Sequence, residues 1–86
     1  MNSASRLTGY RIPVFERGGR VTIRLNGERH ELDAPLSVQA LLERLGIDLR
    51  RVAVERNVTI VKRSAFESTI VAEGDEIEIV NFVGGG

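Results

Sequence analysis

The chain has 86 residues, with no cysteine, a single histidine (His30) and twelve basic residues against twelve acidic ones. This length allows one domain. The lack of cysteine excludes disulfides, a thiolate nucleophile and sulfur carried on a side chain, and one histidine gives no histidine-based metal cluster. The neutral charge gives no general attraction to nucleic acid or membranes, and no apolar run is long enough to span a bilayer. We therefore expect a soluble, cytoplasmic domain without catalytic groups of its own.

The first residues of the chain differ from the rest. Three arginines stand there against one glutamate, and the apolar residues follow no sustained period. Gly18-Gly19 then interrupts the chain. We predict a loose N-terminal extension over residues 1–19 and one folded domain over residues 20–86.

The folded part begins with a predicted hairpin. Apolar residues alternate from Val21 to Leu25, which indicates a half-buried strand. Asn26-Gly27 favours a two-residue type I′ turn, because both residues tolerate positive φ angles. A second strand is predicted over Glu28–Asp33, with His30 packing on the same side as Leu32.

A helix is predicted from about Val38 to Leu45. Ser37 is a suitable N-cap, the apolar residues recur at helical spacing, and Gly46 can end the helix in the left-handed conformation. A helix this short is unstable alone, so its apolar stripe is expected to pack on the sheet.

Three more strands are predicted, over Arg51–Glu55, Val58–Val61 and Glu76–Phe82, with Phe66 closing one end of the core. Two strands, a helix and three further strands suit an α+β fold. We predict a ubiquitin-like β-grasp: a mixed sheet of four to five strands with one main helix packed across one face. The expected core comprises Val21, Ile23, Leu25, Leu32, Val38, Leu41, Leu42, Leu45, Ile77 and Ile79.

The C-terminal end is the most informative part for function. Gly84-Gly85-Gly86 is predicted to be a flexible tail without Cβ atoms, so a partner's channel can close around its backbone. Val80 and Phe82 alternate with the core-facing isoleucines of the last strand, so we expect both on the outer face, as a docking patch beside the tail. A frayed end, a tail left by cloning and scattered surface apolar residues are the alternatives.

Two kinds of charged cluster have weaker interpretations. The basic pairs Arg50-Arg51 and Lys62-Arg63 could guide an acidic partner, although short basic pairs usually belong to a solvated face. The acidic residues of the last turn and strand could complement a basic partner, although solubility demands the same pattern. These residues are Glu73, Asp75, Glu76 and Glu78.

Several short motifs occur together in residues 20–86. They are Asn26-Gly27, Ser37-Val38 with Leu41-Leu42, Val52-Ala53-Val54-Glu55, Arg63-Ser64, Glu73-Gly74-Asp75-Glu76-Ile77 and Phe82-Val83-Gly84-Gly85-Gly86. Together they resemble the ThiS family, the sulfur carrier proteins of thiamine (thiazole) biosynthesis. The chain departs from the family pattern at Asn57-Val58, where members commonly have Asn-Gly, and residues 1–19 have no counterpart.

The resemblance implies a protein co-substrate rather than an enzyme, with no bound cofactor. A ThiF-like adenylyltransferase would use ATP to adenylate the carboxylate of Gly86. A cysteine desulfurase or rhodanese-type protein would supply sulfur to form a thiocarboxylate, and a ThiG-like thiazole synthase would take that sulfur. Partner binding would fall to Val80, Phe82, Val83, Gly84 and Gly85.

Three other functions remain open on the sequence. The first is a sulfur carrier for molybdopterin synthesis, which shares the chemistry. The second is a ubiquitin-like protein modifier, for which Lys62 would be the single site of lysine-linked chains. The third is a β-grasp binding module, which would not need a free glycine terminus.

Overall fold

A computed structural model of the chain describes residues 19–82. Its main sheet has five strands in the order β2-β1-β7-β4-β5. Strands β1 and β7 are parallel, and the other neighbours are antiparallel. The strands are β1 (Val21–Leu25), β2 (Glu28–Leu32), β4 (Val52–Arg56), β5 (Thr59–Val61) and β7 (Glu76–Asn81).

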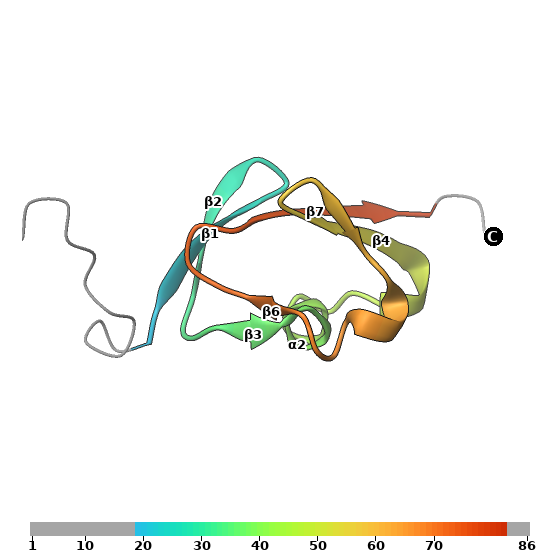
Figure 1. The fold of residues 1–86 in the computed structure, drawn as a ribbon, viewed down its shortest axis with the longest axis horizontal. Helices are drawn as coiled ribbons and strands as arrows, with labels where there is room; N and C mark the ends of the chain where they lie inside the picture. The colour runs from blue at the N-terminus through green and yellow to red at the C-terminus, as the bar shows by residue number, and fades with distance from the viewer. Residues whose placement is uncertain (1–18, 83–86) are drawn as a thin grey trace, which may run out of the picture.

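A second layer lies against one face of this sheet (Figure 1). It contains α2 (Val38–Arg44) and an antiparallel pair of two-residue strands, β3 (Leu36–Ser37) and β6 (Ile70–Val71). The 3-10 turns η2 (Leu49–Arg51) and η3 (Arg63–Ala65) complete the elements. The predicted α+β fold, a mixed sheet with one helix across one face, is confirmed. The pair β3–β6 was not predicted, because two-residue strands show no alternation.

Helix α2 forms for the reasons given by its sequence. The Ser37 hydroxyl accepts a hydrogen bond from the Ala40 N–H at 3.0 Å, and Gly46 follows the helix with φ +74°. The buried side of the helix is formed by Val38, Leu41 and Leu42. The helix ends at Arg44, one residue earlier than predicted, with Leu45 as its C-cap.

The core lies between α2 and the sheet. Most of the predicted core residues are buried, while Leu25, Leu45 and Ile79 are partly buried and pack against the rest. Phe66 is 2% exposed and belongs to this core, as expected. The core also contains residues that were not predicted: Val52, Val54 and Val71.

Candidate functional site beside the end of strand β7

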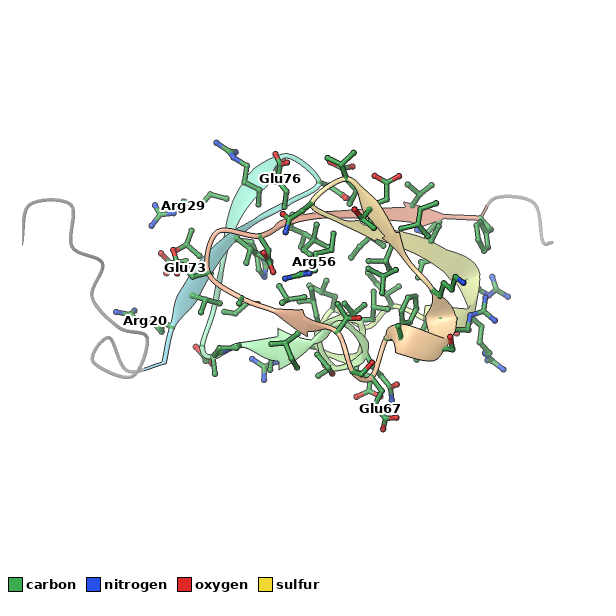
Figure 2. The ribbon with its side chains drawn as sticks, viewed as in Figure 1. Arg20, Arg29, Arg56, Glu67, Glu73 and Glu76 are labelled. Carbon is green, nitrogen blue, oxygen red and sulfur yellow. The ribbon has the colours of Figure 1, made fainter. Side chains whose placement is uncertain are left out.

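The two faces of β7 have opposite environments. Ile77 is 1% exposed and Ile79 packs against the same core. The alternate residues Glu76 and Glu78 are exposed, and Figure 2 shows Glu76 on the side of β7 away from α2. Further along the same face, Val80 is 58% exposed. The sheet therefore has an outer face that no other element of residues 19–82 covers at these positions.

The side chains stay exposed up to the last residue that the structure describes. Val80 lies opposite Ala53 of β4, and the Phe82 N–H donates to the Arg51 carbonyl at 2.8 Å. Phe82 is thus held against β4 while its side chain is 54% exposed. Val80 and Phe82 are both exposed, and Val80 lies on the outer face as predicted; the face on which the Phe82 side chain lies and the role of both residues in binding stay predictions.

Other predictions concern residues outside the described range. The predicted partner contacts Val83, Gly84 and Gly85 and the predicted reactive residue Gly86 lie beyond Phe82, and residues 1–18 of the predicted extension lie before Gly19.

The sequence analysis missed exposed apolar residues on the β4–β5 hairpin. Ile60 is 69% exposed and lies opposite Glu55, which in turn lies opposite Glu78, so Ile60 belongs to the outer face. Val58, in the turn, is 83% exposed. The signal was the parity of Ile60 relative to the partly buried Val61, but a strand of three residues is too short for its alternation to be recognised.

Asp75 does not belong to the acidic surface to which the sequence analysis assigned it. It is only 8% exposed. Its carboxylate accepts from Arg56 Nε at 2.9 Å, from Asn57 Nδ2 at 3.0 Å and from the Ala72 N–H at 2.9 Å. Arg56 points into the space between the sheet and the second layer (Figure 2). The side chain of Asp75 therefore fixes the turn before β7 to the β4–β5 hairpin.

The same contacts set the ionisation of Asp75. Burial opposes its charged form, but the hydrogen bonds from Ala72, Asn57 and Arg56 and the positive charge of Arg56 outweigh burial and lower the pKa of the carboxyl. Asp75 is thus ionised at neutral pH. This is a structural role, away from the end of β7.

The described residues contain no candidate for a metal centre. Within residues 19–82, no group of histidine and carboxylate side chains could hold a metal ion. In the same range, no helix is long and apolar enough to cross a membrane. The arrangement instead presents an apolar surface at the end of a central strand, a geometry suited to protein docking.

The sheet order, the single crossing helix and the exposed face of β7 define the chain as a ubiquitin-like β-grasp protein. The model of the ThiS family matches residues 23–86. The chain belongs to the ThiS family.

Individual relatives agree with this assignment. The crystal structure of the thiamine biosynthesis protein ThiS from Geobacter metallireducens superposes with a TM-score of 0.68 at 35% identity, covering 77% of this chain and all of that one. The thiazole synthase of Paramagnetospirillum magneticum is 50% identical over 62 residues, which are 72% of this chain. The protein ycf40 of Porphyra purpurea is 39% identical over 66 residues, 77% of this chain and 93% of its own length. The chain spans about a fifth of the length of the thiazole synthases that it matches.

Proposed function

We propose that this chain is a sulfur carrier that delivers sulfur for thiazole formation as a thiocarboxylate on Gly86. The observation that carries the proposal is the ThiS family match, which extends through Gly86. The exposed side chains of Val80 and Phe82 add support, because in the sequence only Val83 separates Phe82 from the glycine residues.

The proposed chemistry begins at a carboxylate that is a poor electrophile. A ThiF-like adenylyltransferase joins the Gly86 carboxylate to the α-phosphate of ATP, and pyrophosphate leaves. The terminal sulfur of a persulfide donor, on a cysteine desulfurase or rhodanese-type protein, then attacks the carbonyl carbon and displaces AMP. A thiol cleaves the resulting acyl disulfide and releases the thiocarboxylate. The chain contains no cysteine that could attack either acyl intermediate.

The residues of this chain bind and present rather than catalyse. Val80 and Phe82 provide the apolar contact with the partner, and the glycines pass through a channel that has no space for a Cβ atom. The similarity to thiazole synthases supports a ThiG-like enzyme as the acceptor of the sulfur.

The decisive experiment is the intact mass of the protein after incubation with ATP, a ThiF-like enzyme and a persulfide donor. We expect the mass increase that corresponds to replacing one oxygen by sulfur. Deletion of Gly86 should abolish this increase without changing the melting temperature. Normal sulfur loading of the shortened chain would contradict the proposal and favour a binding module.

The docking role of the outer face has a separate test. Phe82→Ala should raise the KM for the carrier in pyrophosphate release and leave kcat unchanged, because the substitution removes binding and not chemistry. Ile70→Ala is the matched control, since Ile70 is also exposed (49%) but lies on β6 in the second layer. Equal effects of the two substitutions would show that the outer face is not the docking surface.

A further inference from the structure

Two basic segments that are distant in the sequence meet at the end of β7. Arg51 precedes β4, and its carbonyl accepts the N–H of Phe82 at 2.8 Å. Arg63 begins η3, and its Nη2 donates to the Arg50 carbonyl at 3.2 Å. We call Arg50, Arg51 and Arg63 the arginine cluster. Figure 2 shows nitrogen-bearing side chains gathered at the end of the molecule where β7 finishes.

The arginine cluster carries more positive charge than its neighbours neutralise. Asp48 Oδ1 pairs with Arg50 Nε at 3.2 Å, and Asp48 Oδ2 lies 3.8 Å from Arg51 Nε. Hydrogen bonds from Arg50 lower the pKa of the Asp48 carboxyl, so it is ionised at neutral pH. Arg63 has no carboxylate within ion-pair distance among residues 19–82. One carboxylate therefore pairs with two of the three guanidinium groups, and the third has none within ion-pair distance among residues 19–82.

The cluster also follows an order of charges along β4 and β7. Glu55 and Glu78 lie opposite each other across β4 and β7, followed by the apolar pair Ala53 and Val80. Arg51, the last residue of η2, comes directly before β4, and its carbonyl accepts from the Phe82 N–H, so a basic residue lies next to the last described residue. Along β4 and β7 the residues therefore change from acidic through apolar to basic toward Phe82, and a partner with the complementary order fits this end of the molecule in one orientation.

We infer that the arginine cluster docks on an acidic protein surface at the rim of the channel that receives the tail. This inference rests on the proposed function. Four residues, Val83–Gly86, separate the cluster from the reacting carboxylate by up to about 13 Å when extended. A partner that holds Gly86 at its nucleotide therefore meets the arginines at its surface rather than at the phosphates.

Such a contact mainly raises the rate constant for association. The side chains of Arg50 and Arg51 are 77% and 74% exposed, and single exposed ion pairs contribute little affinity. A cluster of like charge that faces an opposite patch instead raises the rate of productive encounter, and salt screens this effect.

The test compares two double charge reversals in carrier-dependent pyrophosphate release with a ThiF-like enzyme. R51E/R63E changes the arginine cluster. R20E/R29E changes the net charge equally, and Figure 2 shows Arg20 and Arg29 at the opposite end of the molecule. At low salt, we expect R51E/R63E to lower kcat/KM for the carrier at least roughly tenfold through KM, and the loss to shrink as salt is added. R20E/R29E should change kcat/KM by less than about threefold.

Further measurements separate the possible failures. R51Q/R63Q removes the charge without adding repulsion toward Asp48, and it should show a smaller loss in the same direction, with a melting temperature near that of the wild type. Equal losses for the two reversals, or a changed KM for ATP in place of the carrier, would overturn the inference and leave the proposed function intact. No pyrophosphate release with the wild-type chain would overturn both.

Discussion

Two tight turns are bonded to the central strand β7. Both place two successive residues at positive φ, but the residues differ. The β1–β2 turn has Asn26 at φ 50° and Gly27 at φ 85°, and the β4–β5 turn has Asn57 at φ 53° and Val58 at φ 70°. A β-branched residue in this left-handed region is strained. The second turn nevertheless keeps the two-residue geometry that Asn-Gly would adopt.

The asparagines explain why the two turns agree. Asn26 binds Ile79 through both polar atoms of its amide, with Oδ1 accepting from the Ile79 N–H at 2.7 Å and Nδ2 donating to its carbonyl at 3.2 Å. Asn57 Oδ1 accepts from the Glu76 N–H at 2.9 Å, while its Nδ2 donates to Asp75. Each turn is thus tied to β7 by its first residue. The comparison teaches that these asparagines, more than the glycine, hold the turns in place.

The largest effect is expected for Asn57→Ala, which should lower the free energy of unfolding by about 3 kcal/mol. The substitution removes two side-chain hydrogen bonds and leaves the buried Asp75 with one donor fewer. Chemical denaturation measures the change. Asn57→Gly is the control, because glycine removes the same side chain but accepts the positive φ; a loss confined to alanine would show that conformation, not the hydrogen bonds, holds the turn.

The dependence of the free energy of unfolding on acidic pH tests the same contacts of Asn57. The pKa of Asp75 is lowered in the folded state, so its contribution to stability is present above its ordinary value of 3.8 and is lost as pH falls through the lower folded value. Asn57→Ala removes one cause of that lowering, so the folded pKa of Asp75 in the variant lies nearer 3.8, and the acid loss should be smaller and complete at a higher pH than in the wild type. Parallel stability curves for the wild type and the variant below pH 5 would contradict this coupling.

Asn26→Ala should cost less, about 2 kcal/mol, because both of its lost hydrogen bonds are exposed and water can replace them. Denaturant titration beside Asn57→Ala gives the comparison directly. A greater loss at Asn26 than at Asn57 would show that Asp75 adds nothing to the second turn.

Gly27→Val makes the first turn a copy of the second. An added Cβ at Gly27 meets no atom within 4 Å, so only backbone strain opposes it. We expect a loss of about 1–2 kcal/mol in the free energy of unfolding. A loss above about 4 kcal/mol would mean that valine displaces the turn itself, in contrast to what Val58 does in the second turn.

The reverse substitution, Val58→Gly, should stabilise the protein by about 0.5–1 kcal/mol, since relief of strain exceeds the entropy that glycine loses on folding. It should change kcat/KM for pyrophosphate release by less than about twofold, because the turn binds Glu76, at the opposite end of β7 from Phe82. Thermal unfolding measures the change in stability, and the pyrophosphate-release assay measures the change in kcat/KM.

The same pair of turns shows how far the sequence predicts the structure. Asn26-Gly27 was recognised from its residues alone, and parity correctly placed the exposed Val80 on the outer face. Asn57-Val58 was not recognised as the same turn, because valine argues against positive φ and the hydrogen bonds to Asp75 and Glu76 are long-range. The arginine cluster was also missed as a unit, because the sequence does not show that the Arg63 side chain reaches the Arg50 carbonyl across the β4–β5 hairpin.

The position of β7 has a consequence for shortened chains. This strand joins β1 to β4, so a chain that stops at residue 75 holds two separate hairpins whose apolar faces lack their central partner. Isolated hairpins of this size are marginal in water. A chain shortened before β7 lacks the centre of the sheet rather than an edge, so we expect it to stay unfolded and open to proteolysis.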